Sequence, residues 1–233
     1  YAPGRKAAGL LMGAEVAALR RMVDDPEQPY VAVVGGAKIS TKTAPLAALL
    51  ERVEALLIGG GMANTMLLAQ GRSVGRSLVE QEMLETATAV LRRASERGVS
   101  IELPTDVVVA DAIASPARVE VVAAGAVPAD MMIVDIGPAT QQRFAAAIAG
   151  ARTVFWTGPM GVFETAEFAA GTMAVARALA ASKAFTVVGG GESVMAVHRA
   201  GVAGAIGHVS TGGGASLEFI TGKVLPAIAA LEA

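Results

Sequence analysis

The sequence predicts an α/β fold in which a parallel sheet lies between two layers of helices, all within a single domain. Two observations predict it. Six short apolar runs each end in a glycine-rich turn, at residues 35–38, 59–62, 136–138, 157–161, 189–192 and 212–215. Stretches with helical spacing follow these turns, and this alternation is typical of the βα units of a parallel sheet. Because such turns lie at one edge of an open sheet, we expect a backbone-lined site there for a ligand with phosphates.

The first half of the chain alternates between helical and β-type patterns. Apolar residues spaced near 3.6 predict a helix over 9–23, and a polar connector at 24–29 ends it. The longest amphipathic stretch, over 79–97, is closed by Gly98. Further helices are predicted over 43–52, with Pro45 in the first turn, and over 62–70. Strands are predicted at 30–34, 55–58, 101–103, 107–110 and 119–123, the last of them at a sheet edge.

The second half continues the alternation without an obvious linker, which supports one domain. Strands are predicted at 131–135, 153–156, 185–188 and 206–209, and helices at 141–149, 168–181, 193–200, 215–221 and 224–231.

The composition favours a large core and limits the partners. Apolar residues make up 53% of the 233 residues, and the net charge of −2 gives no sign of a nucleic-acid groove. The chain has no cysteine, which excludes disulfides and thiolate metal sites. No apolar stretch has the length of a membrane span, and we expect no membrane partner and a cytoplasmic protein. The chain starts at Tyr1 rather than at methionine, which fits either a trimmed terminus or a missing upstream domain, and we expect the missing domain.

Several common catalytic motifs are absent from the sequence. It contains no P-loop, no G-x-G-x-x-G after a strand, no G-x-S-x-G and no H-E-x-x-H. The two histidines, His198 and His208, are expected to have hydrogen-bonded or surface roles rather than catalytic ones. The remaining candidates for functional groups are glycines, a few cationic side chains and a few carboxylates. This set suits phosphoryl transfer, in which the protein mainly positions groups and neutralises charge.

Four charged residues next to the glycine turns are candidates for a phosphate site, and each has a purely structural alternative. Lys38 and Lys42 could bind an anion between them or form a solvated helix start. Glu192 could hold Mg²⁺ together with substrate phosphates, and Glu164 could accept hydrogen bonds from ribose hydroxyls. Either carboxylate could instead complement the dipole of a helix N-terminus. The turn at 212–215 predicts an anion site or a capped tight turn.

Six strings, in this order along the chain, resemble the phosphoglycerate kinase family. They are VGGAKISTK at 34–42, IGGGMANT at 58–65, VDIGP at 134–138, WTGPMGVFE at 156–164, VGGGES at 188–193 and STGGGASLE at 210–218. The resemblance runs from about Gly9 to the C-terminus. It implies the Rossmann-like, C-terminal, nucleotide-binding domain of a two-domain enzyme. Residues 1–12 would be the start of the helix that follows the hinge, and residues 13–233 would be the domain itself.

The resemblance also implies an activity. The family transfers a phosphoryl group reversibly between 1,3-bisphosphoglycerate and Mg-ADP, which gives 3-phosphoglycerate and ATP in glycolysis. The cofactor would be Mg²⁺ with ATP or ADP, and the protein would be a monomer. The acid substrate would bind to an N-terminal domain outside this chain, so the isolated domain is expected to be inactive. Two alternatives remain open, namely a specialised kinase for another carboxylic acid and a nucleotide-binding module without catalysis.

Each site residue receives a role from the resemblance. Lys42 would contact the phosphoryl group during its transfer, and Lys38 would reach the nucleotide phosphates. Pro159 and Glu164 would hold the nucleoside, and Glu192 would bind the metal. The adenine slot would be lined by Gly36, Ala37, Gly60, Gly61, Val134 and Val162. Gly213 and Gly214 would act with Lys42 as catalytic residues by offering N–H groups to the transferring phosphate. The other nucleotide-binding positions would be Thr157, Gly158, Gly189, Gly190, Gly191 and Ser193.

Two of these positions depart from the family pattern. Thr157 stands where the family has asparagine, and a hydroxyl offers one rotatable donor where an amide offers two donors and an acceptor. Glu192 stands where the family has aspartate, and its extra methylene moves the carboxylate although Mg²⁺ tolerates little misplacement. Both changes lie at the nucleotide phosphates. We therefore expect them to affect catalytic efficiency more than nucleotide binding.

Overall fold

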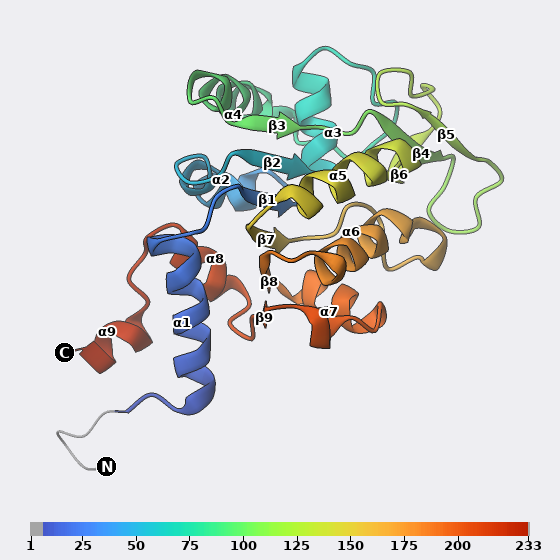
Figure 1. The fold of residues 1–233 in the computed structure, drawn as a ribbon. Coiled ribbons are helices and arrows are strands. Elements are labelled where there is room, and N and C mark those ends of the chain that lie inside the picture. Colours follow the sequence, from blue (N-terminus) through green and yellow to red (C-terminus); the bar gives the residue numbers. More distant parts are fainter. Residues whose placement is uncertain (1–6, 233) are drawn as a thin grey trace.

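A six-stranded parallel sheet forms the centre of the computed structural model, which describes residues 7–232 (Figure 1). The predicted hinge-proximal segment, residues 1–12, therefore lies partly outside the described residues. The strands of this sheet are β1 (Tyr30–Val34), β2 (Ala55–Ile58), β3 (Ser100–Glu102), β7 (Thr153–Thr157), β8 (Phe185–Gly189) and β9 (His208–Val209). Their order across the sheet is β3-β2-β1-β7-β8-β9, and all neighbouring pairs are parallel.

Helices cover both faces of this sheet. The helices of the described residues are α1 (Leu10–Asp24), α2 (Thr43–Leu49), α3 (Gly60–Ala69), α4 (Leu84–Glu96), α5 (Pro138–Gly150), α6 (Ala170–Ala181), α7 (Gly191–Arg199), α8 (Gly214–Ile220) and α9 (Pro226–Glu232). Short 3₁₀ turns complete the pattern, among them η1 (Ser40–Lys42) and η2 (Gln81–Met83). None of the helices in residues 7–232 is both long enough and apolar enough to cross a bilayer.

Side chains of β1 alternate between two hydrophobic cores, as the period of a strand requires. Ala32 and Val34 belong to the core beneath α1, α2, α3, α4 and α8. Val31 and Val33 belong to the core beneath α5, α6 and α7. Because β1 is buried on both faces, it consists almost entirely of apolar residues. The predicted three-layer α/β fold is confirmed.

A second, smaller sheet was not predicted. β4 (Asp106–Ala110) pairs with β5 (Val119–Ala123) on one side and with β6 (Met132–Ile136) on the other, and both pairings are antiparallel. β5 is an edge strand, as expected. However, the glycine turn at 136–138 follows β6 and so does not lie at the edge of the parallel sheet. The expectation that all six glycine turns share one sheet edge is therefore wrong for this turn.

Most predicted elements differ from the structure in their bounds, and three of them illustrate the differences. The helix predicted over 79–97 begins at Leu84, because the preceding residues form a separate 3₁₀ turn. The strand predicted over 206–209 contains only His208 and Val209. The helix predicted over 43–52 ends at Leu49. All three lie at element ends, where local patterns are least informative.

Candidate functional site

The direction of strand addition reverses at the boundary between β1 and β7. From β1 the chain adds β2 and β3 on one side of the sheet, and it later adds β7, β8 and β9 on the other side. The loops that follow β1 and β7 therefore leave the sheet toward opposite faces. Ligands of open α/β sheets bind in the crevice at the carboxyl ends of the strands at such a switch point.

Three loops pack backbone against backbone at this point. The Gly36 N–H donates to the Pro159 carbonyl at 3.0 Å, and the Gly60 N–H donates to the Met160 carbonyl at 2.9 Å. A Cβ atom on Gly35 would overlap the Pro159 carbonyl oxygen, and one on Gly60 would lie 2.7 Å from the Gly36 carbonyl oxygen. Glycine is therefore required for these loops to approach one another this closely.

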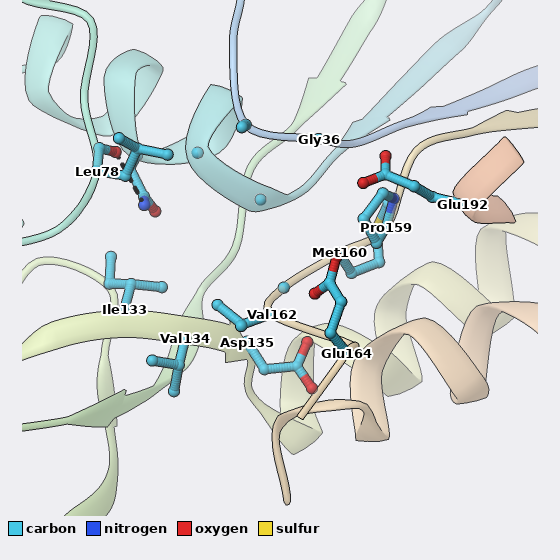
Figure 2. A pocket seen from close by; sticks show the side chains of 15 residues that line it. Gly36, Leu78, Ile133, Val134, Asp135, Pro159, Met160, Val162, Glu164 and Glu192 are labelled. Atoms are coloured by element: carbon cyan, nitrogen blue, oxygen red, sulfur yellow. Dashed lines mark hydrogen bonds between the residues drawn. The ribbon is translucent and has the colours of Figure 1, made fainter. Parts of the chain in front are cut away.

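A cavity of about 170 Å³ opens beside these loops (Figure 2). Sites that enclose a whole drug-sized ligand have volumes of roughly 300–1,000 Å³, so this cavity suits a flat part of a larger ligand. In Figure 2 Leu78, Ile133 and Val134 lie at one end of the cavity, and the carboxylates of Glu164 and Glu192 lie toward the other. The cavity thus has an apolar end and an acidic end.

The structure brings together most of the residues that the sequence singled out for the nucleoside. All six expected adenine residues line the cavity, and so do Pro159, Glu164 and Glu192. Backbone glycines form one side, and Val134 and Val162 are joined by a hydrogen bond of 2.7 Å from the Val162 N–H to the Val134 carbonyl. The contact of each of these residues with a nucleotide stays a prediction.

Sequence reasoning missed six further residues of the cavity. Most of them lie within the strings that carry the family resemblance, so their neighbours could have indicated them. Leu78 lies in a loop with no recognisable pattern, and only the fold brings it to the site. The six residues are Asn64, Leu78, Ile133, Asp135, Met160 and Gly161.

Asp135 is a buried carboxyl group in the wall of the cavity, and it is 1% exposed. Its side chain accepts hydrogen bonds from the N–H of Gly171 at 2.6 Å and from its neighbour Ile136 at 2.9 Å. Burial raises the pKa of Asp135 to about 7, although these hydrogen bonds oppose the shift. This carboxyl group therefore changes charge near neutral pH.

The two predicted lysines lie on the segment that follows β1. Lys42 ends η1 and is half-buried, whereas Lys38 is exposed. The Lys42 ammonium lies over the first glycine turn, since a Cβ on Gly36 would be 3.1 Å from its Nζ atom. Burial lowers the pKa of Lys42, and the negative charge of Glu192 partly opposes this shift. Lys42 and Glu192 are therefore electrostatically coupled across the crevice.

A second hollow of about 370 Å³ lies at the carboxyl ends of β8 and β9. Three predicted phosphate-site residues, Gly190, Gly191 and Gly213, line it together with Val194, His198, Val209, Ser210 and Thr211. Gly191 is the first residue of α7, so the free N–H groups of that helix start lie here. Gly214 begins α8 directly after Gly213.

Other residues predicted at the phosphates lie deeper in the structure. Ser193 is fully buried, and its hydroxyl accepts the Gly158 N–H at 2.5 Å. Thr157 is 2% exposed at the end of β7, and Gly189 ends β8 against Ser216. The Ser193 hydroxyl thus ties the loop after β7 to α7. Whether these residues also contact a ligand stays a prediction.

Binding of a metal ion at this site would require the phosphates of a bound nucleotide as additional ligands. Among residues 7–232 no group of three or more His, Cys, Asp or Glu side chains could hold a metal ion. Mg²⁺ in phosphate sites is usually held by one or two carboxylates together with phosphate oxygens and water. The exposed carboxylate of Glu192 fits that arrangement, because it lines the cavity and is a hard oxygen donor.

Comparisons with known proteins agree with the resemblance of the six strings. The family model described as "Phosphoglycerate kinase" matches residues 1–223. The chain is 54% identical to the phosphoglycerate kinase of Herpetosiphon aurantiacus over 97% of this chain and 57% of that protein. It is 56% identical to the one of Frankia casuarinae over 97% of this chain and 56% of that protein. The chain therefore spans little more than half the length of these relatives.

Solved structures give the same result for the fold. The phosphoglycerate kinase of Coxiella burnetii superposes with a TM-score of 0.93 at 46% identity, over 97% of this chain and 58% of that chain. The one of Pyrococcus horikoshii superposes with a TM-score of 0.83 at 34% identity, over 96% of this chain and 56% of that chain.

Proposed function

Because the chain belongs to the phosphoglycerate kinase family, we propose that it forms the ATP- and ADP-binding half of a phosphoglycerate kinase. The complete enzyme would transfer a phosphoryl group reversibly between 1,3-bisphosphoglycerate and Mg-ADP, giving 3-phosphoglycerate and ATP. The acid substrate would bind outside this chain, and residues 13–233 would form the nucleotide domain. We further propose that the enzyme works as a cytoplasmic monomer.

The observation that carries this proposal is the polarity of the cavity at the switch point. Its apolar end, formed by Leu78, Ile133 and Val134, suits a flat base, and its acidic end suits the polar remainder of a nucleotide. The proposed orientation places adenine between the glycine backbones and Val162. The ribose would then lie toward Glu164.

The phosphates would extend from the ribose toward the lysines and the start of α7. Lys38 and Lys42 would neutralise phosphate charge, and free N–H groups at 190–191 and 213–214 would donate to phosphate oxygens. Glu192 would hold the Mg²⁺ ion, which when bound would neutralise part of the phosphate charge. This division of work needs no nucleophile or general base from the chain.

The coupling between Lys42 and Glu192 supports this placement. Without a nucleotide, the Glu192 carboxylate favours the charged form of the half-buried Lys42. A nucleotide with Mg²⁺ would bring negative phosphates to the lysine and a positive ion to the carboxylate. Lys42 would thus exchange the negative charge of Glu192 for that of the phosphates, and Glu192 would exchange the positive charge of Lys42 for that of Mg²⁺.

Two measurements test the proposal. The full-length gene product should show ADP binding by titration calorimetry in the presence of Mg²⁺, and it should turn over 3-phosphoglycerate and ATP in a coupled assay. Binding without turnover of 3-phosphoglycerate at millimolar concentration would leave only a nucleotide-binding module or a kinase for another acid. Absence of ADP binding would refute the proposal.

A further inference from the structure

Glu80 is a buried carboxylate beside the lysine segment. It lies at the end of the loop after α3, directly before η2, and is 7% exposed. Acidic residues are almost never this deeply buried unless they are paired or hydrogen-bonded. Its contacts therefore indicate what it does.

Both oxygens of the Glu80 carboxylate bind Ser40, the residue midway between the two lysines. Oε1 accepts the Ser40 hydroxyl at 2.5 Å, and Oε2 accepts the Ser40 N–H at 3.1 Å. The backbone of Ile39 also contributes a hydrogen bond to the carboxylate. Glu80 thus caps the start of η1 from a segment 40 residues further along the chain. The residue before η1, Ile39, forms no side-chain capping hydrogen bond of its own.

The main chain of Glu80 is fixed to the helix that follows the second glycine turn. The Glu80 N–H donates to the Thr65 hydroxyl at 3.2 Å, and that hydroxyl donates to the Gly61 carbonyl at 3.1 Å. Gly61 lines the cavity proposed for adenine. A continuous chain of hydrogen bonds therefore runs from the cavity wall through Glu80 to Ser40.

The charge of Glu80 also acts on this segment. Burial alone would raise the pKa of Glu80, but the hydrogen bonds from Ser40 and Ile39 and the charge of Lys38 lower it. The carboxylate therefore stays ionised at neutral pH. Its negative charge attracts the ammonium group of Lys38, at the start of the segment.

We infer that Glu80 is a positioning residue that holds the segment from Lys38 to Lys42 in register with the adenine cavity, so that both lysines reach the phosphates of a bound nucleotide. This inference rests on the proposed nucleotide site. Glu80 itself contacts no ligand in this role. Its effect reaches the phosphates through Ser40 and leaves the base end of the site unchanged.

The inference predicts a selective loss of phosphate binding. In Glu80→Gln the side-chain amide has only one oxygen, which can accept one of the two Ser40 donors. Its NH₂ group cannot accept a hydrogen bond from the other donor. The affinity for Mg-ADP should fall about tenfold, as expected when hydrogen bonds to a charged group are lost. The affinity for adenosine, which has no phosphates, should change less than twofold.

The test compares Mg-ADP and adenosine binding by titration calorimetry in the full-length gene product. Glu82→Gln is the matched control, because it removes the same charge from an exposed residue two positions away and should change neither affinity. Ser40→Ala is a milder variant at an exposed position and should lower Mg-ADP affinity about threefold. Combined with Glu80→Gln it should add almost nothing, because the two residues form one interaction.

Each outcome decides the inference. Equal losses of adenosine and Mg-ADP affinity in Glu80→Gln would show a merely structural role and overturn it. Unchanged binding in both Glu80→Gln and Ser40→Ala would overturn it as well, while leaving the proposed function intact. If Glu80→Gln does not fold, Ser40→Ala alone decides between the selective and the uniform effect. A wild-type protein that binds adenosine and Mg-ADP equally weakly would refute the proposed function itself.

Discussion

The carboxylate of Glu15 on α1 lies 3.0 Å from Nε2 of His208 on β9, although the two residues are 193 positions apart in the chain. The same carboxylate accepts hydrogen bonds from the hydroxyl of Ser210 and from the N–H of Thr211, the latter at 3.1 Å. This cluster joins the first helix to the strand and turn that precede α8. It also confirms the expectation that His208 has a hydrogen-bonded role.

Glu15→Ala should therefore destabilise the fold. Removing the carboxylate leaves several part-buried donors without an acceptor, which should lower the free energy of unfolding by about 2 kcal/mol. Chemical denaturation measures this change. Glu27→Ala is the control, because its ion pair with Arg21 is exposed and should contribute less than about 1 kcal/mol. Equal effects of the two substitutions would contradict the prediction.

The contribution of Glu15 should also depend on pH. Burial alone would raise the pKa of Glu15, but the hydrogen bonds from Ser210, Thr211 and His208 lower it below its ordinary value of 4.5. The unfolded chain therefore binds a proton at Glu15 before the folded one does. The stabilisation is present above pH 4.5 and is lost as the pH falls through the lower folded-state pKa. The stability difference between wild type and Glu15→Ala should shrink accordingly in acid.

Asp135 should give the opposite pH dependence. Its folded-state pKa is raised from 3.8 to about 7, so the folded protein holds this proton more tightly than the unfolded chain does. Its favourable contribution is complete below pH 3.8 and is lost as the pH rises through about 7. Over this interval the wild type should lose up to about 1.4 kcal/mol of stability per pH unit relative to Asp135→Asn. Denaturation curves at several pH values measure the slope, and parallel curves for the two proteins would refute the prediction.

Substitution of Glu192 should move the alkaline limit of nucleotide binding. The charge of Glu192 raises the pKa of Lys42 against the larger lowering by burial, so Glu192→Gln should lower that pKa further. Mg-ADP affinity would then start to fall at a lower pH, and saturation would need about tenfold more Mg²⁺. Calorimetric titrations across the alkaline range measure both effects. Glu167→Gln removes the charge of another exposed glutamate and should change neither; a shift as large as that of Glu192→Gln would refute the assignment.

Gly158→Ala should disrupt the junction between the β1 and β7 loops. Gly158 has a φ of +83°, and a Cβ there would overlap the Gly35 carbonyl oxygen. We expect a loss of about 3 kcal/mol or more, since both backbone strain and a steric clash arise. Gly13→Ala is the control, because Gly13 lies within α1 and an added Cβ there would meet no other atom. This substitution should stabilise the protein by about 0.5–1 kcal/mol. Similar thermal melting of Gly158→Ala and wild type would contradict this reading of the loop.

The sequence was most informative where local chemistry determines structure. β1 and β2 have the predicted bounds, because an apolar β-type run that ends in glycines reports both the strand and its turn. Pairing between distant strands is not encoded locally. β6 looks like a parallel core strand in sequence, yet it pairs antiparallel with β4 in the second sheet.

The same limit applies to the site. The glycines and Val134 could be identified from their strings, whereas Leu78 and Glu80 reach the site only because the loop after α3 folds back on it. The onset of α4 was misplaced for a related reason. Glu80 is engaged with Ser40 and Thr65, and this contact holds the residues before Leu84 outside the helix. Side chains that act through distant partners leave no periodic pattern.

The backbone packing of the first two glycine turns has a consequence for engineering the base preference of this protein. One side of the cavity is main chain from Gly36, Gly60 and Gly61, where a Cβ would either strain a backbone of positive φ or overlap the neighbouring loop. Substitutions on that side would displace the loops and would not simply change the side-chain chemistry that faces a base. A library aimed at nucleotide analogues should therefore vary the side chains that line the rest of the cavity, namely Leu78, Ile133, Val134 and Val162.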